Sequence, residues 1–538
     1  MSLLGGIDWV FIVLYFVVVF GVALWAARRE AARETTTGYF LAGRNTGWFV
    51  IGASLFASNI GSEHLVGLAG TGAASGVAVG QFEVLASLIL LLLGWVFVPF
   101  YLKSGVFTMP EFLERRYSKG ARRYLAWISI VGYVLTKISV TVAAGGIVFE
   151  SLMGVDFWTG ALAVVVATGI YTILGGLTAV LYTDMLQMFV LVGGSLIVTV
   201  TGLQAVGGWD VMVETAGPGF LDMWKPMSDP SFPWTGIAFG APILGVWYWC
   251  TDQFIVQRVL AARNETEARR GTIFAGFLKL LPVFIFVIPG VLAYVLVQQG
   301  KLELGAPDQA LPTLVGTLLP AGLRGIVVAG LLAALMSSLS SVFNSCSTLI
   351  TWDVYKEFRP NAPDHELVLV GQGSTAVLVG LALLWIPLMG AISEQIYTYL
   401  QSVQAYISPP IASVFLLGIL WRRVNARGAM ASLLTGFVLG MGRLVAELNQ
   451  GSLEGWLHTF ATVNFLHFAI GLFVVCTAVL VGVSLTAPAP TAEKLRDLTF
   501  GEVAPRPQAA AGRDRRVNLV LSAFLALAVV AVWVYFSG

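Results

Sequence analysis

Residues 54–83, SLFASNIGSEHLVGLAGTGAASGVAVGQFE, decide the fold of this 538-residue chain. They lie in an apolar segment long enough to cross a bilayer, yet they carry serines, Asn59, Glu63, His64 and many glycines in mid-span. Every backbone polar group needs a partner in hydrocarbon, so such residues indicate a helix that is interrupted beside a buried polar cavity. We therefore expect a broken membrane helix with a solute site next to it.

Close packing between helices is the alternative explanation for this stretch. Small residues at Gly67, Gly70, Gly72 and Gly76 allow a second helix to approach closely. Packing accounts for these glycines but not for the ionisable side chains that precede them. The glycines alone leave both explanations open.

The composition identifies the class of protein. Hydrophobic residues make up 57% of the chain and charged residues 11%, with a mean hydropathy of +0.82, whereas a soluble domain is about 25% charged. The sequence therefore predicts an all-α polytopic membrane protein. The net charge of +1 is scattered over short loops, which argues against a nucleic-acid partner. Cys250, Cys346 and Cys476 lie in apolar segments, which disfavours a disulfide framework or a thiolate metal site.

The hydropathy pattern predicts about fourteen membrane-spanning segments. They are expected near residues 7–27, 46–74, 80–103, 121–152, 157–176, 179–206, 236–258, 269–299, 323–354, 367–389, 395–421, 427–447, 459–485 and 516–536. Most Lys and Arg residues fall in loops that follow odd-numbered segments; only Lys225, Lys301 and Arg324 fall in loops on the other side. Because cytoplasmic loops are enriched in basic residues, we expect both termini outside the cytoplasm, in a protein of the plasma membrane.

A second polar interruption suggests an internal repeat. Residues 245–253 break an apolar segment as residues 57–64 do, and each interruption opens a set of five expected spans. An odd number of spans inverts the second copy, which is the inverted-repeat plan of secondary transporters. In that plan the solute and ion sites lie near the bilayer midplane, beside the broken helices.

Seven ionisable residues lie within the expected spans, where each is a functional candidate because charge is costly in hydrocarbon. They are Glu63, His64, Glu83, Lys137, Asp184, Asp252 and Lys279. Three of them have structural alternatives. The side chain of Lys137 could extend to the membrane surface, that of Asp184 could reach the cytoplasmic interface, and Asp252 could pair with Arg258.

Several segments resemble the sodium/glucose cotransporters of the solute:sodium symporter family. The resemblance covers roughly residues 8–484 and the final helix, and it is carried by residues 52–76, 82–117, ILGGLTAVLYTDMLQ at 173–187, VWYWCTDQFIVQRVLAARN at 246–264, GFLKLLP at 276–282, residues 334–358 and residues 399–425. It implies a LeuT-type five-plus-five inverted repeat. One further helix is expected before the repeats and three after them.

Together these patterns divide the chain into seven parts. We expect an N-terminal helix and cytoplasmic loop at 1–45, repeat one at 46–206, an extracellular loop at 207–235, repeat two at 236–421, two helices at 422–485, a cytoplasmic linker at 486–515 and a C-terminal helix at 516–538. The linker is rich in Pro, Ala and charge, which is typical of a tether.

The resemblance also assigns a sugar site. Its residues are His64, Glu83, Tyr248, Trp249, Lys279 and Gln401. Polar side chains suit sugar hydroxyls, and an aromatic ring such as that of Tyr248 suits the apolar face of the sugar. A buried Lys279 near Glu83 could share charge. The chain departs from the family at Gly245, where relatives have a Thr or Asn that hydrogen-bonds the sugar.

Sodium is the implied coupling ion. By resemblance its ligands are the carbonyls of Ala57, Ile60 and Ala334 and the hydroxyls of Ser337 and Ser338. A possible second sodium site consists of Asp184, Ser337, Ser340 and Ser341. Ala334, Ser337, Ser338 and Ser341 share one helix face, although serines on a face can also simply join two helices.

The sequence thus predicts a symporter that couples inward sodium flow to hexose uptake, of the glucose or galactose type, by alternating access. The alternatives are a symporter for another small solute such as myo-inositol and a sodium-dependent channel or sensor. An enzyme is not expected, because the chain has no GxSxG or HExxH motif and only Lys279 with Glu83 resembles acid–base machinery.

Overall fold

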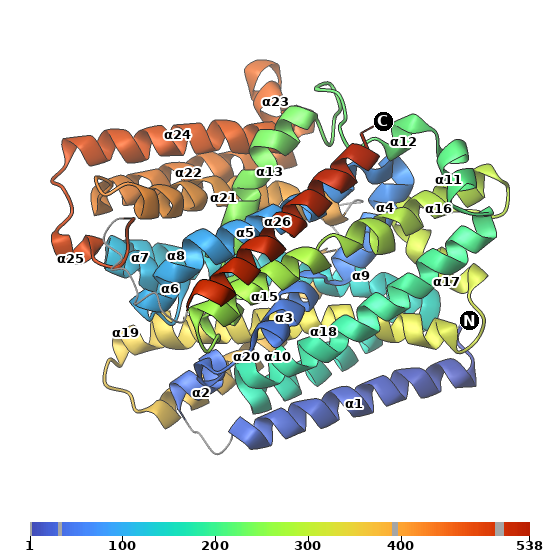
Figure 1. The fold of residues 1–538 in the computed structure, drawn as a ribbon, viewed down its shortest axis with the longest axis horizontal. Coiled ribbons are helices and arrows are strands. Elements are labelled where there is room, and N and C mark those ends of the chain that lie inside the picture. The colour runs from blue at the N-terminus through green and yellow to red at the C-terminus, as the bar shows by residue number, and fades with distance from the viewer. Residues whose placement is uncertain (1–2, 31–34, 390–395, 501–510, 538) are drawn as a thin grey trace.

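The computed structural model describes residues 3–30, 35–389, 396–500 and 511–537, and these parts are almost entirely helical (Figure 1). They contain two isolated β-bridges but no β-strand. The all-α architecture expected from the composition is therefore confirmed.

The long helices form one bundle, in which α26 crosses the front against α5 and α15 (Figure 1). The bounds of the long helices and of the shorter ones packed with them are α1 Gly6–Glu30, α3 Trp48–Asn59, α4 Ser62–Ser75, α5 Gln81–Leu92, α8 Lys119–Gly132, α9 Ser139–Val148, α10 Phe157–Val206, α13 Ala241–Gly245, α14 Gln253–Leu260, α15 Glu265–Leu278, α16 Ile288–Gln298, α18 Leu323–Leu349, α20 Asp364–Met389, α21 Ile396–Leu420, α22 Ala426–Leu448, α24 Phe465–Thr486 and α26 Ala511–Tyr535.

Both expected helix interruptions are present. Between α3 and α4, Ile60 and Gly61 leave helical geometry, with ψ angles of 92° and 179°. In the second repeat the π-helical turn Val246–Thr251 ends at Asp252, whose ψ is 128°, before α14 begins. The Asp252 carboxylate accepts from the N–H of Phe254 at 3.1 Å and so caps α14. A helix that breaks and restarts in each repeat is the arrangement predicted from the polar residues.

Gly176 divides the longest helix. The spans expected at 157–176 and 179–206 are joined in α10, whose 50 residues would extend roughly 75 Å if straight. Gly176 has φ 51° and ψ −151°, outside helical geometry, and a Cβ there would lie 2.5 Å from the carbonyl oxygen of Tyr39. Only glycine tolerates this conformation in such a tight space. The two arms of α10 thus correspond to the two expected spans.

Ten helices in the described residues are long and apolar enough to cross a membrane, and two shorter apolar helices, Trp48–Asn59 and Gly236–Thr251, belong to the broken segments. The count of fourteen spans stays a prediction. The two ends of the chain lie toward the same side of the bundle (Figure 1). Near them, the N–H of Leu3 donates to the carbonyl of Leu152 at 3.3 Å, and the N–H of Met223 donates to the carbonyl of Phe536 at 2.8 Å.

Glycine packing joins α4 to α16. A Cβ at Gly72 would lie 2.5 Å from the carbonyl oxygen of Val287, and one at Gly290 would overlap the carbonyl of Ala69. The two backbones therefore touch without intervening side chains. Close helix packing therefore explains Gly72. The interruption at Ile60 and Gly61 is present as well, so the two explanations hold together.

The linker expected at 486–515 is more than a tether. Residues 487–500 of this linker are called the strap here. Leu498 and Thr499 are buried, the N–H of Phe500 donates to the carbonyl of Ile419 at 2.9 Å, and Nζ of Lys494 donates to the carbonyl of Glu114 at 2.8 Å. Composition hid this docking, because few apolar side chains are involved. Residues 501–510 lie outside the described residues.

Candidate functional site

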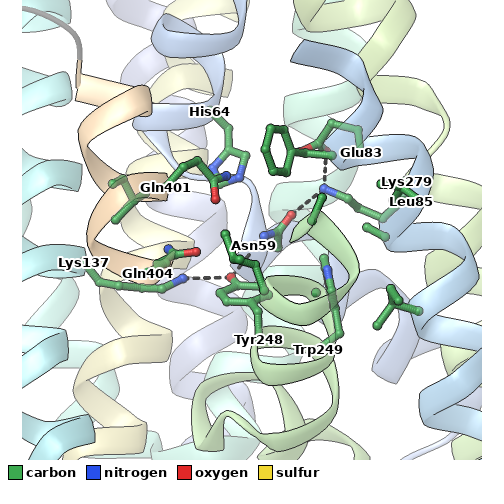
Figure 2. A pocket seen from close by; sticks show the side chains of 17 residues that line it. Asn59, His64, Glu83, Leu85, Lys137, Tyr248, Trp249, Lys279, Gln401 and Gln404 are labelled. Atoms are coloured by element: carbon green, nitrogen blue, oxygen red, sulfur yellow. Dashed lines mark hydrogen bonds and ion pairs between the residues drawn. The ribbon is translucent and has the colours of Figure 1, made fainter. Parts of the chain in front are cut away.

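One cavity contains all six residues that the sequence assigned to the sugar (Figure 2). They are His64, Glu83, Tyr248, Trp249, Lys279 and Gln401. Further polar side chains on its wall are Asn59, Lys137 and Gln404, and the apolar ones include Phe82, Ala86, Ile89 and Leu244. Polar groups thus converge on a partly apolar cavity, as small-molecule sites require.

The helix ends place these side chains. His64 lies in the first turn of α4, just past the first break, and Glu83 lies in the first turn of α5. Tyr248 and Trp249 belong to the turn before the second break, and Lys279 is the residue that ends α15. Gln401 comes from α21. Segments far apart in the chain therefore supply the wall, which explains why no local motif reveals it.

A chain of hydrogen bonds runs through the cavity (Figure 2). Nδ2 of Asn59 donates to the hydroxyl of Tyr248 at 3.0 Å, and Nζ of Lys279 donates to Oδ1 of Asn59 at 2.6 Å. Lys279 also forms an ion pair with Glu83. Both charges are buried, so each compensates the other, as expected from the sequence.

Lys137 lies at the other end of this series of hydrogen bonds. Its ammonium donates to the Tyr248 hydroxyl at 2.8 Å and lies 4.2 Å and 4.1 Å from the ring centres of Tyr248 and Phe254. The side chain is only 6% exposed. The alternative in which it extends to the membrane surface is therefore wrong. The aromatic faces stabilise the buried cation instead.

Sequence reasoning missed three residues of the cavity wall as sugar contacts. Asn59 was noted only as a polar residue at the break, and Lys137 only as an intramembrane charge. Gln404 follows Gln401 by three residues on α21 and so shares its helix face. That spacing was the signal available in the sequence. Gly245 also lines the cavity, where a Cβ would lie 3.1 Å from Cγ1 of Ile89.

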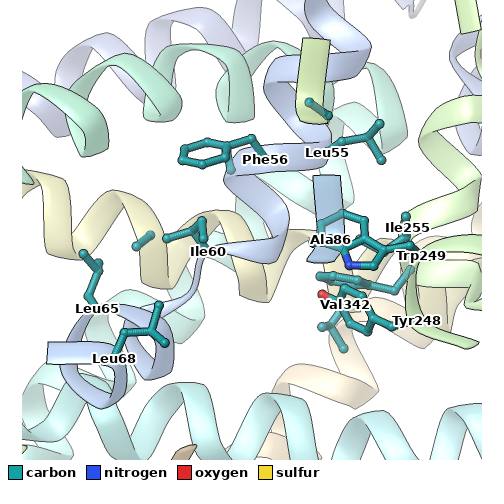
Figure 3. Packing of buried hydrophobic residues seen from close by; sticks show 14 of the residues in the cluster. Leu55, Phe56, Ile60, Leu65, Leu68, Ala86, Tyr248, Trp249, Ile255 and Val342 are labelled. Carbon is teal, nitrogen blue, oxygen red and sulfur yellow. The ribbon is translucent and has the colours of Figure 1, made fainter. Parts of the chain in front are cut away.

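Apolar side chains surround both breaks. Figure 3 shows Phe56 and Ile60 on the first broken helix and Trp249 and Ile255 on the second, all of them in the main buried core. Irregular backbone is tolerated at membrane depth only where protein covers it or where it lines a polar cavity. This packing meets the first condition.

The break in the first repeat frees two of the carbonyls assigned to sodium. In an unbroken helix the N–H of Gly61 would donate to Ala57 and that of His64 to Ile60. Here Gly61 donates to the carbonyl of Asn59 at 3.1 Å, and His64 donates to that of Gly61 at 3.0 Å. The oxygens of Ala57 and Ile60 are thereby released from helical bonding, which is the property an ion ligand needs.

The serine face of α18 lies against this break. Oγ of Ser338 donates to the carbonyl of Ser58 at 3.2 Å, and Ala334, Ser337 and Ser338 are all buried. Oγ of Ser340 donates within its own helix, to the carbonyl of Ser337 at 3.0 Å. Oxygen atoms from two helices therefore gather at one place, whether they hold an ion or join the helices.

Asp184 lies at the centre of a polar cluster. Its two oxygens accept from Oγ of Ser337 and Oγ of Ser54, each at 2.6 Å. The guanidinium of Arg258 lies 3.5 Å from the carboxylate and also donates to Ser341. Asp184 is fully buried, so the interpretation that it reaches the membrane interface is wrong.

Arg258 also corrects a further expectation. Its side chain is fully buried. It was offered as a partner for Asp252, yet its ion pair is with Asp184. Asp252 instead caps α14 through one oxygen, and its Oδ2 has no hydrogen-bond partner.

Cys250, Cys346 and Cys476 are free and buried. Within the described residues, no group of three or more His, Cys, Asp or Glu side chains is arranged to hold a metal ion. A sodium site built from carbonyl and hydroxyl oxygens would not fall into such a group.

Known proteins resemble the chain over most of its length. A model described as "Sodium:solute symporter family" matches residues 39–436. Sodium/glucose cotransporter 1 of Oryctolagus cuniculus is 42% identical in an alignment that covers 89% of this chain and 79% of that protein. The sodium/myo-inositol cotransporter of Homo sapiens is 39% identical in an alignment that covers 93% of this chain and 76% of that protein.

Solved structures confirm the fold. A Na⁺-coupled sialic acid symporter, in a substrate-bound outward-open state, aligns with a TM-score of 0.78 at 22% identity, covering 90% of this chain and 99% of the other. The nucleobase-cation-symport-1 family transporter Mhp1 aligns at 0.53 and 15% identity, covering 85% and 97%. The LeuT-type architecture expected from the sequence is therefore present. The chain belongs to the sodium:solute symporter family, as a membrane transporter, not an enzyme, with sodium as its coupled ion.

Proposed function

We propose that this protein takes up a neutral hexose of the glucose or galactose type, driven by inward sodium flow through alternating access. One observation carries the proposal: six residues assigned from scattered segments line a single cavity between the two helix breaks. The names of the sodium/glucose cotransporters that resemble it support the same substrate class. The solute would be bound and moved without covalent change.

The cavity wall suits a neutral polyol. Sugar hydroxyls both donate and accept, and the wall offers the carboxylate of Glu83, the ammonium of Lys279 and the amide of Gln401. The ring of Tyr248 would cover the apolar C–H face of the sugar, and His64 and Trp249 would complete the enclosure. Because Lys279 already neutralises Glu83, a neutral solute leaves the charge balance undisturbed.

The coupling ion would bind at the first break. Its ligands would be the carbonyls of Ala57, Ile60 and Ala334 and the hydroxyls of Ser337 and Ser338. The released carbonyls of Ala57 and Ile60 support this assignment, since a broken helix exposes oxygens that an intact helix uses internally. This ion site shares α3 with Asn59 of the sugar cavity. Sodium and sugar would therefore stabilise the same arrangement of the break.

A second sodium ion would bind at Asp184 with Ser337, Ser340 and Ser341. All four are buried and have side-chain oxygens, and Ser337 donates directly to Asp184. A carboxylate with hydroxyl neighbours provides the hard oxygen ligands that an alkali cation prefers.

Myo-inositol is the second candidate substrate. The sodium/myo-inositol cotransporters are nearly as similar to this chain as the glucose cotransporters are. Gly245 supplies no side chain to the cavity, so the wall lacks a polar group with which a hydroxyl could be distinguished there. The stereochemistry of one or two hydroxyls would decide between these solutes.

The proposed location is the plasma membrane, with both termini outside the cytoplasm. The same-sided chain ends and the concentration of basic residues in the loops on the opposite side support this orientation. Cysteines introduced near Met1 and Gly538, probed with an impermeant thiol reagent on intact cells, would react from outside. Labelling only after permeabilisation would reverse the orientation.

Transport in proteoliposomes tests the function. With a sodium gradient imposed, labelled glucose, galactose and myo-inositol should be compared for initial uptake. A gradient-dependent accumulation of one hexose above the others is expected, with exchange of labelled for unlabelled sugar. Preference for myo-inositol would select the second candidate. Sodium-independent flux without exchange would indicate a channel instead.

A further inference from the structure

Arg258 is a buried cation held at the proposed second sodium site. Its side chain is fully buried. The guanidinium donates from Nε to Oγ of Ser54 at 3.0 Å, and it also donates to Ser341 and to the carbonyl of Phe254. It lies 3.5 Å from Asp184. One side chain thus engages the carboxylate and one hydroxyl that a second sodium would use.

We propose that Arg258 competes with sodium for Asp184: the guanidinium neutralises the carboxylate when no ion is bound there, and withdraws when sodium binds. The inference rests on the proposed second sodium site. It adds that the competitor is part of the protein, so the site is never left with an unpaired buried charge.

Charge balance makes the two cations alternatives. A fully buried carboxylate is strongly destabilising when it is unpaired, and one positive charge compensates it. Sodium and guanidinium each supply one. Both together would leave an excess positive charge in the same buried cluster, and both would require the oxygens of Asp184 and Ser341. Occupation by one therefore disfavours the other.

The position of Arg258 connects ion binding to the sugar cavity. Arg258 lies on α14, directly after the second break, while Tyr248 and Trp249 lie directly before it. Its partners lie on other elements: Ser54 on α3, Asp184 on α10 and Ser341 on α18. Release of Arg258 from these partners would remove its hydrogen bonds and ion pair to three neighbouring helices, while Gln257 on α14 would still bond to Ser345 and Thr348 of α18. Sodium at Asp184 would thus weaken the attachment of the part of the second broken helix that follows the sugar contacts.

Sodium-dependent thermal stability of the purified full-length protein tests the competition. The wild type, Arg258→Lys and Arg258→Gln would be heated in detergent with increasing NaCl, at an ionic strength held constant with choline chloride. Without its competitor, sodium is the only cation left for Asp184. The sodium concentration that gives half of the stabilisation should therefore fall about tenfold or more in Arg258→Gln. Arg258→Lys, which keeps the charge but offers fewer donors, should fall between that variant and the wild type.

A charge-neutral pair provides the control. In Asp184→Asn/Arg258→Gln the carboxylate is gone. The part of the sodium-dependent stabilisation that comes from Asp184 should therefore disappear, while the part that comes from the first sodium site remains. A half-point in both single variants equal to or above that of the wild type would overturn the competition. A double variant that keeps the high-affinity sodium stabilisation expected for Arg258→Gln would also overturn the competition.

The measurement separates this inference from the proposed function. The first sodium site contributes to the stabilisation of every variant, including the double variant that lacks Asp184, and hexose uptake is measured independently in proteoliposomes. If the wild type responds to sodium and transports hexose while the Arg258 variants show no increased response, only the competition fails. If Arg258→Gln does not fold, Arg258→Lys still gives the predicted direction.

Discussion

The side-chain amide of Asn59 donates to the hydroxyl of Tyr248 at 3.0 Å, and this bond joins the two helix breaks across the cavity. Asn59 is the last residue of α3, and Tyr248 lies four residues before Asp252. The contact therefore links the first repeat, which carries the proposed sodium carbonyls, to the second, which carries the aromatic wall. Any solute that contacts both residues would be held by both repeats.

Replacing Gln401 by Ala should weaken apparent sugar affinity about tenfold or more. A hydroxyl left unpaired in a buried site costs roughly 1 to 3 kcal/mol. The measurement is the sugar concentration for half-maximal uptake at saturating sodium. The sodium dependence should be retained, which separates loss of a sugar contact from loss of fold. Unchanged sugar affinity in both Gln401→Ala and Glu83→Ala would remove these residues from the site.

The double variant Ser337→Ala/Ser338→Ala should lose sodium-driven uptake while the protein remains folded. Alanine keeps the face of α18 small, so packing between helices should survive, but two ion ligands are deleted. Ser347→Ala is a matched control on the same helix, because its buried hydroxyl donates to the carbonyl of Gly371 at 2.7 Å, away from the break. Sodium titration of uptake should show a large loss in the double variant and little change in the control. Wild-type sodium dependence in the double variant would contradict the assignment.

Two sodium ions should accompany each sugar. One ion moving down 100 mV releases about 2.3 kcal/mol, and a tenfold gradient adds about 1.4 kcal/mol. One ion therefore supports a roughly few-hundredfold accumulation of sugar and two about 10⁵-fold. Reversal potentials at varied sugar gradients give the ratio directly. A ratio of one that Asp184→Ala leaves unaltered would show that Asp184 binds no transported ion.

Adding a side chain at Gly245 should change the choice among sugars. A Cβ there requires the side chain of Ile89 to move by a few tenths of an ångström, and a threonine hydroxyl would then face the cavity. A new polar group discriminates against solutes that leave it unpaired, by a factor of about ten for roughly 1.4 kcal/mol. The uptake ratios of glucose, galactose and myo-inositol in Gly245→Thr and Gly245→Ala measure this. Equal ratios in both variants and the wild type would exclude position 245 as a determinant.

The stability of the protein should depend on pH through Asp308. This residue lies in the short turn Pro307–Gln309 outside the membrane-spanning helices, and its carboxylate packs against Gly70 of α4. Burial raises the pKa of the Asp308 carboxyl from 3.8 to about 6. The folded state then binds the proton more tightly than the unfolded state, so the free energy of unfolding should fall as the pH rises from about 4 to 6.

Asp308→Asn should remove this dependence. The variant should match the wild type near pH 4 and unfold at a higher temperature above pH 6, where the wild-type carboxylate is charged. Thermal unfolding at several pH values, in detergent and constant sodium, provides the comparison. Parallel curves for the two proteins between pH 4 and 7 would contradict the raised pKa.

The helix breaks and the sugar residues were predictable for different reasons. Asn59, Glu63 and His64 are costly in a lipid-facing helix, so their presence in mid-span was sufficient to predict the break. Lys279 stands out only as an intramembrane charge and Gln401 only as a polar residue within a span. The resemblance to a known family was needed to assign both to one site. The family relationship and the fold confirm that resemblance, while the roles of the individual residues stay predictions.

The partner of Arg258 was not predictable from the sequence. Asp252 is the nearest carboxylate along the chain, six residues before Arg258, so proximity in the sequence alone suggested a pair between them. The break reorients Asp252 toward the N–H of Phe254, and the fold brings Asp184 from α10 instead. Such pairing depends on three-dimensional packing between repeats. The docked strap was missed for the same reason, since its contacts are mostly with backbone carbonyls.

The direct backbone contact between α4 and α16 has a mechanical consequence. At Gly72 and Gly290 the backbones of the two segments approach so closely that these positions hold no side chain that could change rotamer and absorb a displacement. We expect them to tilt as one rigid unit. His64 lies in the first turn of α4, and Lys279 lies on the segment that leads into α16. The separation of these two residues should therefore stay constant while access to the cavity changes from one side of the membrane to the other.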